Sequence, residues 1–256
     1  MKILKFKKQS KDKYKLYLDD NSEITLYEDV IIKNNLLITK QIDKKLLDDL
    51  EKENNDRKAY ILAVNYISIK MRSIKEINDY LIKKDFCHKV INEQIKKLIK
   101  DGYLNDEKFA VSFINDSINL TNKGPLKIKK ELIGYGVNKE IVDEKIDLID
   151  SNTVRNKLEK LIDKQLRIKK GSMNAIKLKL INYFVNLGYS KSMIDDLLSN
   201  KEISSDKTRL KKDYEKLYNK YKFKYDKQEL LYFISQKLYS KGYTANDIKE
   251  IIKEEK

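Results

Sequence analysis

The feature of this sequence that most constrains its fold is an internal repeat of about fifty residues. When the chain from residue 57 onward is compared with itself at offsets of 51, 52 and 54 residues, six columns align in four copies. Five of these columns are apolar in every copy. They begin with Ile77, Ile128, Leu180 and Ile234 and end with Ile95, Ile146, Leu198 and Ile252. Self-similarity at this period is typical of repeat proteins, so we expect four copies of one small unit rather than a single globule.

Each copy is predicted to contain three helices. The first two apolar columns are four residues apart, as are the last two, and this spacing places side chains on one face of a helix. The sixth column lies between these pairs and holds Asp85, Gly136, Gly188 and Gly242. Both residue types tolerate the left-handed backbone that often ends a helix. A further amphipathic helix precedes each pair, so we expect an elongated, curved array of three-helix, helix-turn-helix-like repeats.

The N-terminal segment has a different pattern. Two β-rich runs, Tyr14–Leu18 and Glu23–Tyr27, flank four turn-forming residues at positions 19–22 and predict a hairpin. Residues around Leu4 and Phe6, and the run Val30–Ile32, are candidates for additional strands. A helical pattern begins after position 43 and is expected to end in the polar stretch 51–56.

The predicted fold class is therefore mainly α, with a small N-terminal β module. The expected domains are the β-rich module at residues 1–55 and four three-helix repeats at residues 56–105, 106–150, 151–203 and 204–256, called repeats 1 to 4 below.

Positive charge exceeds negative charge, with 55 Lys and Arg against 40 Asp and Glu and a net charge of +15. The excess is absent from residues 1–56 and lies in the rest of the chain. A basic surface favours acidic partners such as nucleic acids. Because nearly all of the positive residues are Lys, an ordinary solvated surface is an alternative interpretation of much of this charge.

Residue types needed for catalysis are scarce. Cys87 and His88 are the only Cys and His, which excludes a disulfide within the chain and argues against a zinc site or a Cys–His nucleophile pair. No Gly-rich phosphate loop is present, so we expect neither enzymatic activity nor a cofactor. No apolar run approaches about eighteen residues, and the N-terminus lacks the apolar core of a signal peptide. We therefore expect no membrane contact and a cytoplasmic location.

Three basic clusters are candidate binding sites. The densest comprises Lys164, Arg167, Lys169, Lys170, Lys177 and Lys179. A second alternates with aromatic residues and comprises Lys220, Lys222 and Lys224. This pattern is suited to phosphate contact with base stacking, although the neighbouring rings also have the spacing of a helix core. The third comprises Lys123, Lys127 and Lys130. With so few Arg residues, phosphate contact by Lys is favoured over bidentate readout of guanine.

Three segments resemble the RecX family, whose members regulate the bacterial RecA recombinase. Gly102–Ala110 is similar to the linker that enters the second repeat of that family, and Lys123–Leu132 is similar to its glycine, proline, basic, isoleucine, glutamate, leucine stretch. Met71–Ile77 resembles an arginine-serine, glutamate-leucine stretch of the first repeat, which makes Arg72 a further candidate contact. Ser73 and Glu76 in this stretch also form a capping-box pattern, which has a structural role of its own.

The resemblance implies a non-enzymatic, monomeric protein that binds the RecA–single-stranded DNA filament. It implies dampened strand exchange, ATP hydrolysis and co-protease activity in homologous recombination, DNA repair and the SOS response. Single-stranded DNA is the implied nucleic-acid partner, with duplex DNA as a second candidate. Composition and periodicity alone favour a different class, a helical-repeat protein that binds double-stranded DNA or regulates transcription.

Overall fold

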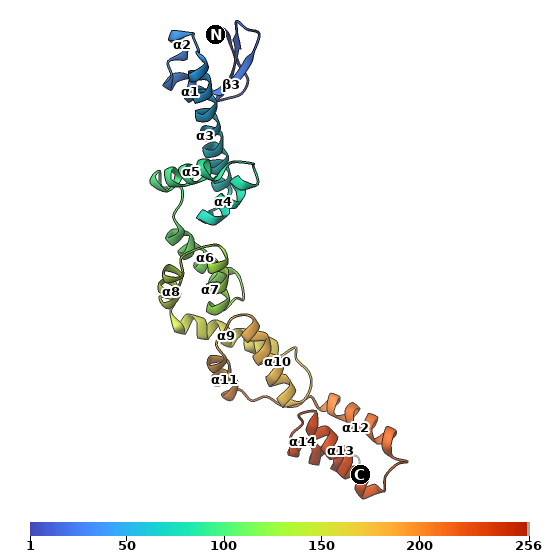
Figure 1. Ribbon diagram of the computed structural model, residues 1–256. Helices are drawn as coiled ribbons and strands as arrows, with labels where there is room; N and C mark the ends of the chain where they lie inside the picture. Colours follow the sequence, from blue (N-terminus) through green and yellow to red (C-terminus); the bar gives the residue numbers. More distant parts are fainter. Residues whose placement is uncertain (255–256) are drawn as a thin grey trace. The chain divides into compact units, whose positions relative to one another are not determined.

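The computed structural model describes residues 1–254, which form three strands and fourteen helices (Figure 1). The chain divides into two compact units, Met1–Ala110 with Tyr135–Asn138, and Val111–Gly134 with Lys139–Lys256. The elements are β1 (Ile3–Lys8), β2 (Lys13–Leu18), β3 (Glu23–Tyr27), α1 (Glu28–Lys33), α2 (Leu36–Thr39), α3 (Lys44–Ile69), α4 (Ile74–Ile82), α5 (His88–Lys100), α6 (Asp106–Leu120), α7 (Pro125–Gly134), α8 (Lys139–Asp147), α9 (Ser151–Leu166), α10 (Met173–Asn186), α11 (Lys191–Ser199), α12 (Lys207–Tyr221), α13 (Lys227–Ser240) and α14 (Ala245–Glu254). The mainly helical class with an N-terminal sheet is confirmed.

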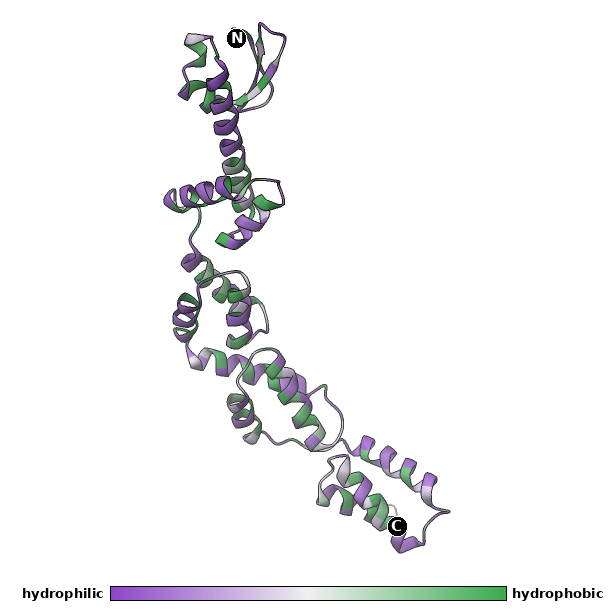
Figure 2. Cartoon of the chain, viewed as in Figure 1, coloured by the Kyte–Doolittle hydropathy of each residue, from purple (hydrophilic) through white to green (hydrophobic). Residues whose placement is uncertain are grey.

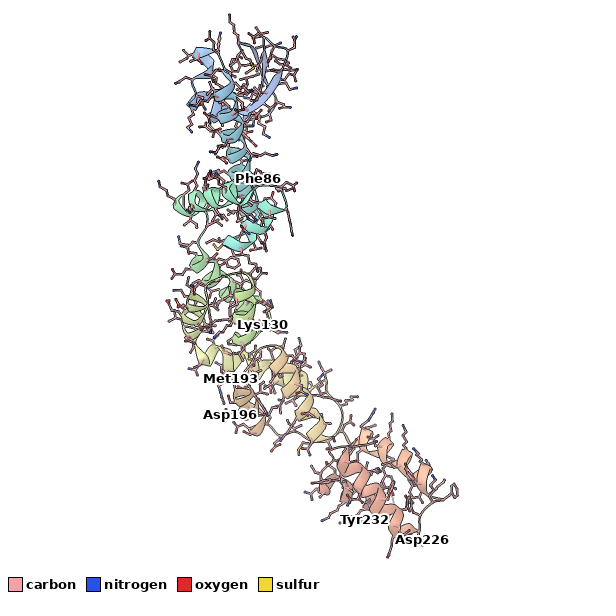
Figure 3. The ribbon with its side chains drawn as sticks, in the orientation of Figure 1. Phe86, Lys130, Met193, Asp196, Asp226 and Tyr232 are labelled. Atoms are coloured by element: carbon pink, nitrogen blue, oxygen red, sulfur yellow. The ribbon has the colours of Figure 1, made fainter. Side chains whose placement is uncertain are left out.

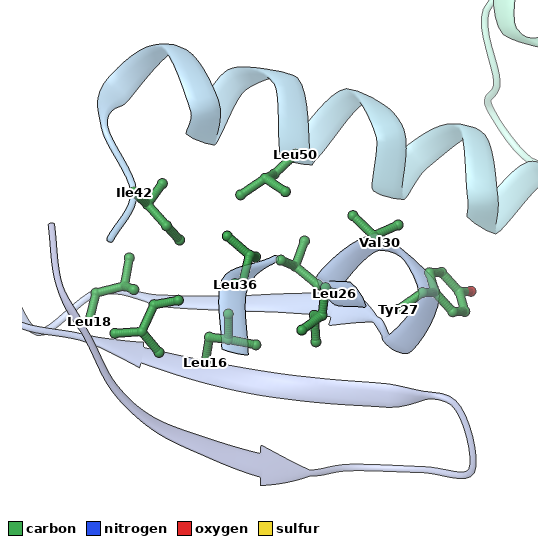
Figure 4. Packing of buried hydrophobic residues seen from close by; sticks show 10 residues of the cluster. Leu16, Leu18, Leu26, Tyr27, Val30, Leu36, Ile42 and Leu50 are labelled. Atoms are coloured by element: carbon green, nitrogen blue, oxygen red, sulfur yellow. The ribbon is translucent and has the colours of Figure 1, made fainter. Parts of the chain in front are cut away.

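The N-terminal module is an antiparallel sheet with strand order β1-β2-β3, and α1 and α3 pack against β3. Alternate side chains of the strands point towards these helices, as expected for a sheet with one covered face. Leu16, Leu26, Leu36 and Leu50 are fully buried between them (Figure 4). The predicted hairpin and the additional strand around Leu4 and Phe6 are thus confirmed.

The predicted strand at Val30–Ile32 is wrong, because this segment belongs to α1. Val30 and Ile31 are both buried, whereas adjacent side chains of a strand point to opposite faces of its sheet. Acidic residues in the first turn and Lys33 in the last turn also suit the dipole of a helix. A short apolar run does not by itself distinguish a strand from a helix.

The helix end predicted at residues 51–56 is also wrong, because α3 continues unbroken through this stretch. Its N-terminal part contributes Leu50 to the core of the β module, and its C-terminal part contributes Ala59 to the core of repeat 1. The polar stretch has a partner of its own, since the Asn54 side chain accepts a hydrogen bond from the Tyr27 backbone N–H at 2.9 Å. The domain boundary expected near residue 55 therefore falls inside a helix.

The three helices expected in each repeat are present. Repeat 1 is formed by the C-terminal part of α3 with α4 and α5, and the later repeats by α6–α8, α9–α11 and α12–α14. The first four apolar columns are buried in every copy, and hydrophobic residues lie on the inner faces of the helices (Figure 2). In the last column Ile95 and Leu198 are buried, whereas Ile146 and Ile252 are only half-buried.

The turn column has a left-handed backbone in all four copies, as predicted. The angle φ is 63° at Asp85, 81° at Gly136, 89° at Gly188 and 88° at Gly242. In repeats 3 and 4 the hydroxyls of Ser190 and Thr244, which lie two residues after the turn glycine, accept backbone N–H groups of the following helices. Each repeat therefore reverses direction at a left-handed residue, and in repeats 3 and 4 a side-chain cap begins the next helix.

Successive repeats are joined at corresponding places. The N-terminus of the second helix of one repeat meets the turn of the next repeat. Three hydrogen bonds mark these junctions, from Ser73 Oγ to the Tyr135 carbonyl at 2.8 Å, from Gly124 N–H to the Leu187 carbonyl at 2.6 Å, and from Ser172 Oγ to the Lys241 carbonyl at 2.6 Å. The first junction lies within the N-terminal compact unit and the other two within the C-terminal unit.

Candidate nucleic-acid interface

An open cavity of about 560 Å³ lies at the junction of repeats 3 and 4. Hydrogen bonds fix its wall, because the Gly171 carbonyl accepts the Asp206 N–H at 2.9 Å and the Met173 N–H donates to Ser205 Oγ at 3.1 Å. Together with the Ser172 hydroxyl, these bonds hold the link between α9 and α10 against the start of α12 and the turn before α14.

Cationic side chains dominate the lining of this junction cavity. The charged residues are Lys170 and Lys179 from repeat 3, and Arg209, Lys212, Lys241, Asp206 and Asp213 from repeat 4. Five cations thus face two carboxylates in one recess. Since field lines from like charges are focused in a recess, the cavity favours an anion over a cation.

Both carboxylates are already engaged within the wall. Asp213 accepts hydrogen bonds from Lys241 Nζ at 2.8 Å and from the Tyr243 hydroxyl at 2.9 Å. Burial works against ionisation of Asp213, but these hydrogen bonds and the charge of Lys241 hold its pKa below its usual range. Burial and the hydrogen bond to Asp213 raise the pKa of Tyr243. Asp206 accepts the Arg209 backbone N–H as the N-cap of α12.

Lys170, Lys179 and Lys212 are the cations of the wall that remain open to a ligand. No carboxylate among residues 1–254 forms an ion pair with any of them, and all three are exposed. Ammonium groups on flexible stems act as point charges, which suits phosphate contact without sequence readout. The chemistry available at this site is therefore binding of a polyanion.

The structure brings together only part of the densest predicted cluster. Lys170 and Lys179 line the cavity, whereas Lys177 is half-buried on α10 and does not. Lys169 lies with its Nζ 5.8 Å from the centroid of the Tyr183 ring. Lys164 and Arg167 are exposed at the end of α9, outside the lining.

Arg209, Lys212 and Lys241 are residues of the cavity that sequence reasoning missed. They belong to the next repeat, so no local charge count includes them with Lys170. A first signal was available in the sequence, because Arg209 and Lys212 are three residues apart on a helix and share a face. The position of Lys241 directly before the turn glycine is a second signal, because that turn is where the preceding repeat docks.

The third cluster, in repeat 2, is divided among different environments. Lys123 Nζ forms an ion pair with Glu131 at 2.5 Å. The backbone of Lys127 packs directly on Gly188 at the junction with repeat 3. Lys130 is exposed on α7 (Figure 3). Lys130 is therefore the member of this cluster that is most accessible to a ligand.

Arg72 is engaged at the start of α4. Its Nη1 lies 3.0 Å from Glu76 Oε1, and its guanidinium carbon lies 3.8 Å from the centroid of the Tyr66 ring. The predicted capping box of Ser73 and Glu76 is confirmed. Since only 10% of the Arg72 side chain is exposed, its main contacts are within repeat 1.

The basic and aromatic stretch lies at the end of α12. Lys220, Lys222 and Lys224 are exposed, as expected for candidate contacts. Tyr221 packs edge-on against Phe233 with ring centroids 4.8 Å apart, so the alternative interpretation as core is correct for this ring.

No group of His, Cys, Asp and Glu within residues 1–254 is arranged to hold a metal ion. Among the same residues, no helix has the length and apolar character needed to cross a membrane.

The fold and the cavity define a class of protein. It consists of tandem three-helix repeats in which the start of the second helix of one repeat contacts the turn of the next repeat, and it carries a recess suited to a polyanion. Two family models match the chain, "RecX, first three-helix domain" at residues 59–98 and "RecX, second three-helix domain" at residues 105–146. A Bacillus cereus (strain 03BB102) protein named "Regulatory protein RecX" is 31% identical over 254 residues, covering 96% of this chain and 94% of its own. The chain belongs to the RecX family.

Further relatives and solved structures with the same name are also similar to this chain. A protein of the same name from Streptococcus sanguinis (strain SK36) is 30% identical over 258 residues and covers 99% of both chains. A solved structure described as RecX from Lactobacillus salivarius has 28% identity and a TM-score of 0.54, covering 57% of this chain and 96% of that one. Another, described as regulatory protein RecX, is similar in fold, with 24% identity, a TM-score of 0.66, and coverage of 78% and 99%.

Proposed function

We propose that this protein regulates the RecA recombinase by binding the RecA–single-stranded DNA filament. In this proposal it mostly inhibits the recombinase, ATPase and co-protease activities of the filament in DNA repair and the SOS response. It acts in the cytoplasm as a monomer and catalyses no reaction itself. The support from relatives is that proteins named "Regulatory protein RecX" match nearly its whole length.

The junction cavity is the single observation that carries the nucleic-acid part of this proposal. Lys170, Lys179 and Lys212 offer three ammonium groups without carboxylate partners among residues 1–254, and the phosphates of a DNA strand are the anions a filament presents. Interactions of this kind are individually weak. When several repeats bind one filament, the weak contacts together give a higher overall affinity, because binding of one repeat raises the effective concentration of the next.

The activity test is RecA ATPase on single-stranded DNA, measured with and without this protein. We expect the ATPase rate to fall, and we expect tighter binding to the assembled filament than to free RecA or bare DNA. An unchanged rate together with equal affinity for naked duplex would contradict the proposal. That result would instead favour the class of double-stranded DNA-binding or transcriptional regulators.

The cavity is tested by changing Lys170, Lys179 and Lys212 together to Gln. We expect weaker filament binding and a flatter salt dependence, because each single-strand phosphate that is no longer neutralised by a lysine removes about 0.7 from the slope of log affinity against log salt. A matched control changes three exposed lysines of the same unit that lie outside the cavity, Lys191, Lys216 and Lys249. If both triple variants flatten the slope equally, general surface charge rather than the cavity binds the phosphates.

A further inference from the structure

The loop that follows α12 presents an aromatic side chain almost entirely to solvent. Phe223 is 89% exposed, the largest exposed fraction among the big hydrophobic side chains of residues 1–254. A side chain in this state gains almost nothing from apolar burial, so the fold of repeat 4 does not explain its presence. A ring that contributes nothing to a core is available to a ligand.

The neighbouring rings of this loop are occupied, which singles out Phe223. Tyr221 and Tyr225 both pack on Phe233, with centroid separations of 4.8 Å and 5.0 Å. Lys220 and Lys224 lie over the Tyr221 ring at 5.3 Å and 5.9 Å. The alternation of rings and lysines in the sequence therefore separates in space into an anchored aromatic cluster and one projecting ring.

Positive charge lies beside the projecting ring. Lys222 Nζ lies 5.2 Å from the Phe223 centroid. No carboxylate among residues 1–254 forms an ion pair with Lys220, Lys222 or Lys224. The loop has one carboxylate of its own, Asp226 at the start of α13 (Figure 3). An exposed aromatic face beside unpaired ammonium groups is complementary to a ligand that carries both a flat ring and phosphates.

We propose that Phe223 stacks on an unpaired base of a single-stranded nucleic acid, while Lys220, Lys222 and Lys224 contact the flanking phosphates. Stacking platforms of this kind tolerate every base, because each base has a π-face. In a duplex the bases are stacked on one another, so this loop discriminates single strands from double strands. The inference rests on the proposed function for the identity of the strand, and adds a second contact point distinct from the junction cavity.

The test uses the full chain, two substitutions at Phe223 and two oligonucleotides. Phe223→Trp introduces the only tryptophan of the protein, since the sequence otherwise has none, and its fluorescence should be quenched by a short oligothymidylate but not by an abasic oligomer of equal length. Phe223→Ala should weaken binding of the oligothymidylate by about 5-fold or more, and leave the weaker affinity for the abasic oligomer unchanged. Because the ring is exposed, neither substitution should alter the circular dichroism spectrum.

Tyr232→Ala is the matched control, because this ring is 69% exposed on α13 of the same repeat (Figure 3). Its affinity for both oligonucleotides should equal that of the wild type. Wild-type protein that binds both oligomers equally, or a Phe223→Ala variant that retains the preference for bases, would overturn the inference. Filament binding is measured separately with RecA. Loss of stacking with intact filament binding refutes only this inference, whereas stacking without filament binding refutes only the proposed function.

Discussion

The turn of repeat 1 and the turns of the later repeats share a left-handed backbone but differ in residue and surroundings. Asp85 is exposed at φ 63°. At Gly188, a Cβ atom would lie 2.3 Å from the Lys127 backbone nitrogen, and at Gly242 one would lie 2.9 Å from Ser172 Oγ. The left-handed turn alone therefore tolerates a side chain, and the docking of the preceding repeat is what demands glycine. Repeat 1 follows the β module instead of another repeat, so its turn has no such demand.

The largest effect is expected from Gly188→Ala. The left-handed backbone costs an alanine about 1–2 kcal/mol, and overlap with the backbone of Lys127 adds about 1–3 kcal/mol. The control is Gly102→Ala, because Gly102 has φ 81° and nothing within 4 Å of the added Cβ. Urea unfolding followed by circular dichroism measures both variants. Equal destabilisation of the two variants would show that the close approach of Lys127 to Gly188 does not add to the cost of the substitution.

A smaller effect is expected from Ser172→Ala, which removes the hydrogen bond to the Lys241 carbonyl. Ser172 is 2% exposed, and its hydroxyl also accepts the Ala175 N–H as the N-cap of α10, so loss of both bonds should cost about 1–3 kcal/mol. Ser190→Ala is a matched control, since Ser190 caps α11 but is exposed and makes no junction bond; its loss should cost about 0.5–1 kcal/mol. Hydrogen exchange of repeat 4 should rise in the first variant and not in the second.

Acid should weaken the last junction and spare the first. Hydrogen bonds to Asp247 from Ser205 and Thr244 outweigh the effect of burial and lower its pKa, and the pKa of Asp213 is lowered as well. Such carboxylates contribute stability above their unfolded-state pKa, and that stability is lost as the pH falls through their folded-state pKa. We therefore expect faster hydrogen exchange in repeat 4 as the pH falls below the ordinary pKa of an aspartate, about 3.9.

The pKa of Asp106, which lies at the first junction, is shifted in the opposite direction. Burial raises its pKa, although it accepts the Ile74 N–H at 2.9 Å. Its ionised form therefore opposes folding, and stability falls as the pH rises through its folded-state pKa. Asp106→Asn should stabilise repeat 1 at neutral pH, and the gain should vanish in acid. An equal gain at both pH values would contradict this assignment of the charge effect.

The smallest effect is expected from Asp85→Gly. Glycine relieves the left-handed strain but increases the conformational freedom of the unfolded chain. These opposing terms should leave the free energy of unfolding within about 1 kcal/mol of the wild type. A thermal melt measures this change, and a large loss of stability would mean that the Asp85 side chain has a structural role its exposure does not suggest.

Much of the fold was predictable because helix periodicity and capping act locally. The buried columns from Ile77 to Ile248, the left-handed turns and the Ser73 capping box all follow from neighbouring residues. The two errors have different causes. The run Val30–Ile32 is too short to reveal its period, and the polar stretch in α3 is explained only by the bond from Tyr27 to Asn54, which are distant in sequence.

The candidate site was predictable only in part, because it is made between repeats. Lys170 and Lys179 were found from charge density, but their partners in the cavity are brought there by the bond between Ser172 and Lys241. No periodicity within one repeat encodes that register. The exposure of Phe223 could not be predicted either, because Tyr221, Phe223 and Tyr225 alternate evenly with lysines in the sequence.

The unbroken helix α3 has a mechanical consequence. An α-helix advances 1.5 Å per residue, so its 26 residues span about 39 Å and reach from one hydrophobic core to another. Such a rod resists twisting, because rotation about its axis would break consecutive backbone hydrogen bonds. One residue inserted between Leu50 and Ala59 would rotate the two parts of the helix by about 100° relative to each other and would move Ile61 away from the core of the β module against which it packs. The direction in which the N-terminal module presents its surface is thus set by the rotational phase of a single helix.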